Sequence, residues 1–323
     1  MWTCYKVYLE AKSPIHIGYG AKLGIVDRTR YYIPAKNIWG ALTNLIARNI
    51  MRSYNSKVYQ EIGKYINENI KFSYFYPVEY KKISEKIEII QVFAPCYTED
   101  GLKFGVCKDK EKITSEKFEQ TFISSFVSTA IDKASKSTEK ESLHEIEFIR
   151  DKIELNSCVK PTVFVGYFFA KDERLKIRVG TEKSEISFTN FSIEVNGSKL
   201  NEIWIGGERN YGLGRIKILS LEKFNKDKVY IFDSGVMVDV TGEQLIVDSE
   251  DGRKTALSHV NIENLNINLI LGDIEPLIGR EWNEKGSGQK ISQTAKICIV
   301  PGSQLVYDSI IYISNFGLWE VGK

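Results

Sequence analysis

The residues best suited to chemistry gather in a glycine-rich segment at 206–215. Four glycines in nine positions let a backbone adopt positive φ, approach a ligand closely and turn N–H groups toward phosphate oxygens: Gly206, Gly207, Gly212 and Gly214. Arg209 and Arg215 add positive charge, and Tyr211 offers a ring on which an unpaired base could stack. The segment predicts either a phosphate-binding loop or a glycine-rich turn at the end of a strand.

The same segment excludes the common nucleotide-binding motifs. Gly207 and Gly212 have the spacing of a phosphate loop, but Leu213 and Gly214 stand where Lys and Ser or Thr are needed. Lys217 occupies the place of the third glycine in a dinucleotide-binding fingerprint. A nucleotide triphosphatase is therefore not expected.

Three histidines leave few candidates for metal chemistry or acid–base catalysis. His144 begins a zinc-protease pattern, but Phe148 stands where its second ligand would be, so we expect His144 to be packed in the core or hydrogen-bonded. We expect His259 at the surface. His16 precedes a loop with Gly18, the only histidine beside a plausible ligand surface, and a structural role is the main expectation for it.

The charge is nearly balanced over the whole chain but not within it. Forty-four Lys and Arg against 42 Asp and Glu give +2, which is no global sign of a nucleic-acid binder. Residues 1–52, however, hold eight basic and two acidic side chains, together with Tyr19, Tyr31 and Tyr32. Such a mixture predicts a track for single-stranded RNA, with an ordinary solvated surface as the alternative.

Composition bounds the class of protein. The chain has 323 residues, 43% of them hydrophobic and rich in Tyr and Phe, which suits a strand-rich globular fold of one or two domains. Five scattered cysteines form no C-x-x-C pair, so we expect neither a disulfide framework nor a zinc site, and a reduced, cytoplasmic setting. No leader-like or membrane-spanning run is evident, and we expect no metal, no cofactor and no membrane partner.

The elements that position these residues follow from periodicity. We expect a helix over 38–50 with Asn37 as its N-cap, a helical insertion at about 51–121, a short helix over 198–204, and a glycine-rich loop over 279–288. Alternating or apolar runs predict strands at 4–12, 143–149, 162–170, 175–179, 186–195, 216–224, 229–233, 236–240, 266–271, 295–300 and 304–313. The polar segment 225–228 marks a domain boundary.

Three motifs in order resemble the RAMP superfamily of CRISPR-associated proteins. Ser13–Gly18 followed by Tyr32–Leu42 is similar to its opening strand and helix entry, although Ala35-Lys36 replaces the usual Gly-Ser. Ala130–Lys133 with Leu143–Ile149 is similar to a pair of strands in the family, and Gly206–Arg215 to its signature glycine-rich loop. The agreement in order and spacing covers about two hundred residues, so it is more specific than any single motif.

The resemblance implies an α+β fold: a ferredoxin-like (RRM-like) domain over 1–224 with the insertion, then a smaller β-rich domain over 225–323, as a degenerate second RRM-like domain. Gly279–Trp282 and Val300–Ser303 look like the C-terminal region of the subunit that holds the 5′ tag of the guide RNA (crRNA) and caps one end of type III complexes. Its family partners are the large polymerase-like subunit and the adjacent RAMP backbone subunit. The implied RNA-binding residues are Gly206, Gly207, Arg209, Asn210, Tyr211, Gly212, Gly214, Arg215, His16, Lys22, Arg28, Arg30, Lys36 and Trp282.

Three other functions stay open. A metal-independent endoribonuclease that processes guide-RNA precursors would use His16 as general acid or base, but no second group is evident. A backbone subunit would cut target RNA with a loop aspartate such as Asp132, which the long C-terminal part argues against. A scaffolding role without RNA contact also fits a net charge of +2.

Overall fold

The computed structural model describes most of the chain, and the expected mixture of many strands with a few helices is confirmed. The described residues are 1–20, 24–51, 56–84, 86–106, 111–131, 134–138, 142–155, 157–179, 182–249, 253–263, 268–283, 286–291, 295–306 and 309–322.

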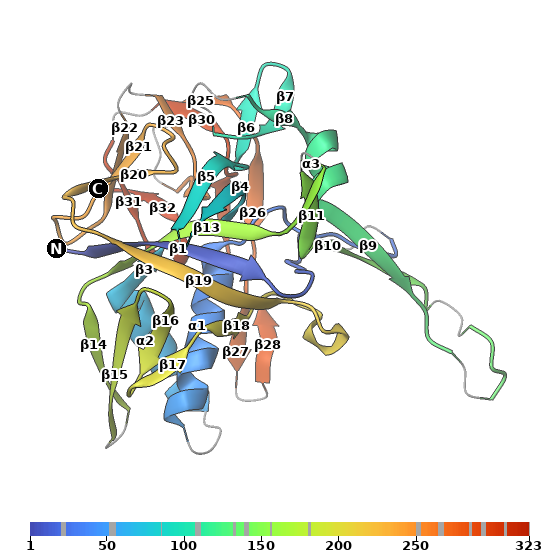
Figure 1. Ribbon diagram of the computed structural model, residues 1–323, viewed down its shortest axis with the longest axis horizontal. Coiled ribbons are helices and arrows are strands. Elements are labelled where there is room, and N and C mark those ends of the chain that lie inside the picture. Colours follow the sequence, from blue (N-terminus) through green and yellow to red (C-terminus); the bar gives the residue numbers. More distant parts are fainter. Residues whose placement is uncertain are drawn as a thin grey trace.

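A seven-stranded sheet forms the centre of the first part of the chain (Figure 1). Its strands, in spatial order, are β18 (Glu202–Trp204), β19 (Arg215–Phe224), β1 (Thr3–Ala11), β13 (Val163–Ala170), β4 (Tyr76–Ile83) and β5 (Lys86–Val92), and β3 (Ile70–Phe72) also pairs with β13. All pairings in this sheet are antiparallel. All eight residues of β13 are buried, so both faces of this strand are covered.

Three helices occur within the described residues: α1 (Ala35–Ile50), α2 (Ser56–Asn69) and α3 (Ser115–Phe122). Ile38, Leu42 and Ile46 of α1 repeat every four residues and are buried, as the periodicity predicts. The expected N-cap is wrong, because α1 begins after Pro34 and Asn37 lies inside its first turn. Proline fixes a φ that suits this position, and no side chain caps the helix.

The helical insertion expected at 51–121 is wrong for most of its length. Besides α2 and α3 the stretch holds β3, β4 and β5, which belong to the central sheet. It also holds a separate three-stranded sheet of β6 (Pro95–Thr98), β7 (Gly101–Phe104) and β8 (Ile113–Thr114). β5 does alternate in its burial, so a strand signal was present in this stretch and was missed.

A long hairpin extends away from the body of the molecule (Figure 1). Its strands are β9 (Ile123–Ser128) and β10 (His144–Ile149), and β2 (Val26–Asp27) pairs in parallel with β10. The next hairpin joins β11 (Lys152–Leu155) to β12 (Cys158–Pro161). The register places His144 opposite Ser128 and Ile149 opposite Ile123, so the strand expected at 143–149 is confirmed.

The segment that follows β13 in the sequence and precedes β19 forms a separate four-stranded antiparallel sheet. It contains β14 (Arg174–Val179), β15 (Glu182–Thr189), β16 (Ser192–Val195) and β17 (Ser198–Leu200). The helix expected over 198–204 is therefore wrong, because β17 and β18 occupy that range, and the strand expected over 186–195 is two strands. A ferredoxin-like pattern has a helix in the connection between β13 and β19, where this chain has the four-stranded sheet. The ferredoxin-like details therefore stay a prediction.

The C-terminal part is built from strands, with one short 3₁₀ turn, η2 (Asn315–Gly317). The eight-stranded sheet runs β20 (Lys228–Ile231), β21 (Val236–Asp239), β22 (Ile246–Ser249), β31 (Ile311–Ile313), β32 (Trp319–Val321), β24 (Val260–Asn261), β29 (Lys296–Ile299) and β26 (Ile274–Leu277). The smaller sheets are β23 (Arg253–Thr255), β30 (Gln304–Val306) and β25 (Asn268–Leu271), and the hairpin β27 (Arg280–Asn283) with β28 (Gly286–Ile291).

This arrangement corrects two expectations for the C-terminal part. The loop expected over 279–288 is largely the β27–β28 hairpin, and the strand expected over 304–313 is split into β30 and β31. The boundary at 225–228 and the second domain stay predictions. One continuous hydrophobic core includes residues from both sides of that boundary, such as Val7 and Val238.

Two further observations concern the class of protein. Cys96 is disulfide-bonded, so the expectation that all cysteines are reduced is wrong at this residue. Within the described ranges, none of the helices has the length and apolar character that crossing a membrane requires.

Candidate nucleic-acid interface

Two loops that are distant in sequence lie against each other at one end of the central sheet. β1 pairs with β19, so the segment after β1 and the segment before β19 meet. Ile205 N donates to Gly214 O at 2.8 Å and closes the second loop on itself, while Lys12 N donates to Arg215 O at 2.8 Å across the two loops. The two loops therefore lie at the same end of the central sheet.

The backbone of the glycine-rich loop is largely occupied by these contacts. Gly207 N donates to His16 O at 3.0 Å, and Gly214 N donates to Pro14 O at 2.8 Å. Gly212 N donates to Arg209 O at 3.0 Å in the short 3₁₀ turn η1 (Arg209–Tyr211). These amides are already paired within the protein, which favours the turn over a phosphate cradle as the role of the glycine backbone.

Gly206 and Gly214 must be glycines because a backbone carbonyl oxygen lies very close to each of them. Gly206 has φ +73°, and a Cβ there would lie 2.1 Å from the carbonyl oxygen of His16. Gly214 has φ +88°, and a Cβ there would lie 2.0 Å from the carbonyl oxygen of Ile205. No other residue type fits either position without moving backbone.

His16 lies beneath this loop. Its side chain belongs to a residue that is only 3% exposed, and Nδ1 donates to the Glu147 carbonyl at 2.7 Å. Nε2 lies 3.8 Å from an oxygen of Asp27. These contacts fit the structural role expected for His16 and leave its ring little access to a substrate.

The side chains of η1 point outward instead. Arg209, Asn210 and Tyr211 are exposed, and the Tyr211 ring lies 5.8 Å from the ring of Phe126 on the hairpin. Tyr211 keeps 53% of its surface exposed, so one part of its ring is free for stacking. We call Arg209, Asn210, Tyr211 and Phe126 the loop face.

A second cation acts on the loop face. Partial burial of the guanidinium lowers the pKa of Arg209, Tyr59 opposes this shift, and the charge of Arg48 on α1 adds a smaller lowering. Arg48 is exposed and was not singled out from the sequence, because only the fold brings α1 toward the loop.

Other predicted arginines are engaged in ion pairs. Arg215 contacts the Glu202 carboxylate with two nitrogens, at 3.0 Å from Nε and 2.8 Å from Nη2. Arg28 lies 4.0 Å from Glu147. Arg30 is largely buried and pairs with Glu275 at 2.7 Å. The structure thus separates Arg30 from the loop face and couples it to the C-terminal part.

The remaining predicted residues lie elsewhere. Lys36, at the start of α1, lines a groove between α1 and the C-terminal strands. Trp282 belongs to β27, but its side chain lies outside what the structure describes, as do Lys22 and Asp132.

The prediction that His259 lies at the surface is wrong. It is 0% exposed rather than at the surface, and Tyr74 Oη donates to its Nδ1 at 2.6 Å. Its Nε2–H donates to Glu275, which Arg30 also contacts. The partners come from distant parts of the chain, so no local pattern could have found this network.

The described side chains contain no cluster of three or more His, Cys, Asp or Glu that could hold a metal ion. The loop face consists of Arg209, Asn210 and Tyr211 on the glycine turn and Phe126 on β9.

Comparisons with known proteins give one family and a set of similar folds. The model of the RAMP superfamily matches residues 8–217. A comparison with curated proteins found no significant match.

Two solved structures are similar over nearly the whole chain. A chain from the cryo-EM structure of the Type III-B Cmr-beta bound to cognate target RNA and AMPPnP, state 1, has a TM-score of 0.52 at 12% identity, covering 93% of this chain and 85% of that one. A chain from the structure bound to cognate target RNA has a TM-score of 0.50 at 11% identity, covering 98% and 99%. At these identities the likeness concerns the fold.

Proposed function

Because the chain belongs to the RAMP superfamily, we propose that it is a guide-RNA (crRNA) binding subunit of a type III CRISPR effector complex, acting in antiviral defence. In this proposal it holds the 5′ tag, caps one end of the complex, and contacts the large polymerase-like subunit and the adjacent RAMP backbone subunit. The fold is similar to chains of Type III-B Cmr-beta structures that contain target RNA, which supports this class of complex.

The observation that carries the proposal is the loop face. Its exposed Arg209 and Tyr211 lie on a turn whose glycines hold it against residues 14–16, just after the end of β1. A guanidinium beside a half-exposed ring is suited to hold a phosphate and stack the adjacent unpaired base. The amides of Gly207, Gly212 and Gly214 serve the turn, so the side chains would carry the RNA contact.

The first test is the RNA that accompanies the protein. We expect the protein, purified through an affinity label together with its natural partners, to carry RNAs that share one common 5′ segment. RNAs without a shared 5′ segment would contradict the tag-binding role. The alternative of a processing nuclease would instead be supported by site-specific cleavage of a repeat RNA that is lost in His16→Ala.

The second test is the salt dependence of RNA binding. Arg209→Gln should weaken binding of single-stranded guide RNA and reduce the slope of log K against log salt by about 0.7, since one phosphate contact is lost. Arg215→Gln should have a smaller effect because Glu202 already pairs with this side chain. Lys199→Gln, on exposed β17, is the control, and an unchanged slope in Arg209→Gln would contradict the proposed contact.

A further inference from the structure

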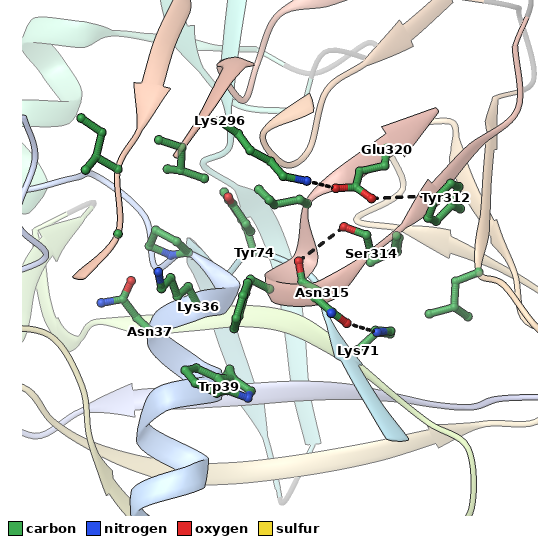
Figure 2. A pocket seen from close by; sticks show the side chains of 18 of the residues that line it. Lys36, Asn37, Trp39, Lys71, Tyr74, Lys296, Tyr312, Ser314, Asn315 and Glu320 are labelled. Carbon is green, nitrogen blue, oxygen red and sulfur yellow. Dashed lines mark hydrogen bonds and ion pairs between the residues drawn. The ribbon is translucent and has the colours of Figure 1, made fainter. Parts of the chain in front are cut away.

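Lys71 lines a large groove between the helices of the first part and the strands of the C-terminal part (Figure 2). Its Nζ donates to the backbone carbonyl of Asn67 at 2.6 Å and to the side-chain oxygen of Asn315, and both acceptors are uncharged. Among the described side chains, no carboxylate forms an ion pair with Lys71. Lys296 differs, because it lines the same groove and pairs with the Glu320 carboxylate.

The fold fixes the position of the Lys71 amine. Ile70 and Phe72 on either side of it are buried, so the alternation of β3 directs Lys71 to the opposite face, where it is only partly buried. Asn67 belongs to the last turn of α2, in which backbone carbonyls lack partners within the helix. Asn315 begins η2 in the C-terminal part. The two hydrogen bonds therefore hold Nζ between α2 and η2.

The surroundings of Lys71 favour the neutral amine. Burial and the charge of Lys171 lower the pKa of Lys71 to about 8, against the opposing effects of Glu320 and Glu68. Lys171 directly follows β13, and its Nζ lies 5.5 Å from the centroid of the Trp2 ring, which also lines the groove. A lysine that is desolvated and lies beside a second cation is a stronger nucleophile near neutral pH than an ordinary surface lysine.

The hydrogen bonds also determine which side of the neutral amine can react. A neutral amine has two N–H groups and one lone pair. The Asn67 carbonyl and the Asn315 side-chain oxygen accept both N–H groups. The remaining tetrahedral position of Nζ, which carries the lone pair, is therefore available to an electrophile in the groove.

The charge near Lys71 favours an electrophile that is itself negative. Lys171 is exposed and lies close enough to Lys71 to influence its charge. An acyl phosphate combines a reactive acyl carbon with a phosphate group that such a cation attracts. The groove has a volume of about 1600 Å³, which is ample for a small molecule of this class.

We propose that Lys71 is an acylation site, at which the neutral amine accepts an acyl group from a small acyl phosphate. The lone pair of Nζ attacks the acyl carbon, and the new C–N bond forms as the C–O bond to the phosphate breaks. Inorganic phosphate leaves with the electron pair of that bond, and the nitrogen releases one proton to solvent. The product is an uncharged amide with a single N–H.

Acylation weakens a link between the two parts of the chain. The amide keeps one N–H, so it cannot donate to both Asn67 and Asn315 as the amine does. Asn315 begins η2, and the ring of Phe316 in the same turn packs edge-on against Trp39 of α1 at 4.9 Å between centroids. Modification of Lys71 therefore loosens the contact of η2 with the helices.

The test is acetylation of the full-length chain by limiting acetyl phosphate, followed by mass spectrometry of its peptides. At pH 7.5, Lys71 should be acetylated about tenfold faster than Lys199 on exposed β17, since more of its amine is neutral. The rate at Lys71 should level off above about pH 8, whereas an ordinary lysine becomes steadily more reactive beyond pH 9. Lys296, in the same groove but paired with Glu320, should react no faster than Lys199.

Asn315→Asp is the matched variant, because it keeps the shape of the side chain and adds a negative charge beside Nζ. The carboxylate should stabilise the ammonium form, so acetylation of Lys71 should slow several-fold and level off at a higher pH, with no change at Lys199. N-hydroxysuccinimidyl acetate, an uncharged donor, should prefer Lys71 over Lys199 less strongly than acetyl phosphate does. An equal preference would contradict an anionic donor.

Three results would overturn the acylation site itself. These are acetylation of Lys71 no faster than that of Lys199, a rate at Lys71 that still rises beyond pH 9, and an unchanged rate in Asn315→Asp. The structural consequence has its own measurement: Lys71→Gln, an uncharged substitute for the acylated side chain, should lower the urea midpoint relative to Lys199→Gln. Equal midpoints would contradict a loosened contact of η2.

The inference goes beyond the proposed function, and the two can fail separately. Lys71 does not belong to the loop face. Arg209→Gln should weaken binding of guide RNA and leave acetylation of Lys71 unchanged. Asn315→Asp should slow acetylation of Lys71 and leave binding of guide RNA unchanged.

Discussion

At the residue scale, the pKa values of His259 and Glu275 are set by burial and by partners that are distant in the sequence. His259 lies in a polar stretch, yet Tyr74, Glu275 and Arg30 enclose it. Burial lowers the pKa of His259 against the opposing pull of Glu275, so the ring is neutral with its proton on Nε2. Burial alone would raise the pKa of Glu275, but hydrogen bonds from His259 and Arg30 and the charge of Arg30 lower it to about 2.

These shifts predict how stability depends on pH. Below the ordinary histidine pKa of 6.5, the unfolded chain binds a proton at His259 that the folded chain does not, so stability falls on acidification. The slope contributed by one site is at most about 1.4 kcal/mol per pH unit. Glu275 adds a second loss, from about pH 4.5 down to about 2, as its carboxylate is protonated.

Urea unfolding of the unmutated chain and of His259→Gln at pH 7.5, 6.5 and 5.5 measures the first effect. Glutamine keeps a donor and an acceptor but does not titrate, so the variant should be less stable at pH 7.5 and lose less stability on acidification. Parallel pH profiles for the two proteins would contradict the assignment of a buried neutral His259.

At the element scale, the glycine-rich loop is a packing device that presents side chains. Gly206 and Gly214 permit the contact with residues 13–16, and η1 then projects Arg209 and Tyr211. The sequence predicted the loop, its arginines and its tyrosine. It could not show that the amides of Gly207 and Gly214 are paired, because their acceptors, His16 and Pro14, lie about two hundred residues away in the sequence.

Alanine substitutions should distinguish the cost of a steric clash with neighbouring backbone from the cost of a positive φ alone. Gly206→Ala and Gly214→Ala should each destabilise the protein by about 3 kcal/mol or more, since both add a clash to an unfavourable φ. Gly212→Ala, with φ +81° but open space around it, should lose only about 1–2 kcal/mol. Chemical denaturation checks the ranking, and equal losses at all three positions would refute the packing role.

Other elements show which signals were available and which were not. The alternation in 4–12 and 143–149 predicted β1 and β10, although β1 also buries Cys4 and Tyr8 on the face expected to be polar. Ser198–Trp204 was interpreted as a helix although Asn196-Gly197 precedes it, both with positive φ, a strong hairpin signal. β3 is too short, at three residues, for its alternation to stand out, and β4 is buried in its first three residues and exposed in its last three, so it shows no regular alternation.

At the scale of the whole molecule, contacts between distant segments join the two parts of the chain. Arg30 pairs with Glu275, and Tyr76 Oη donates to the Leu257 carbonyl at 2.9 Å. Gly302 has φ +91°, and a Cβ there would lie 2.6 Å from the carbonyl carbon of Pro95. The segment 300–303, which resembled a family motif, therefore packs against β6.

The shared core predicts that both parts unfold together. Apolar side chains from before and after residue 225 form one continuous cluster, so opening either part would expose apolar surface of the other. Urea unfolding followed by tryptophan fluorescence and by far-ultraviolet circular dichroism should give coincident transitions. Gly302→Ala should lower the midpoint of both probes equally, because it forces apart the contact with Pro95. Two separated transitions, or a shift in one probe alone, would show instead that the parts are independent domains joined at residues 225–228.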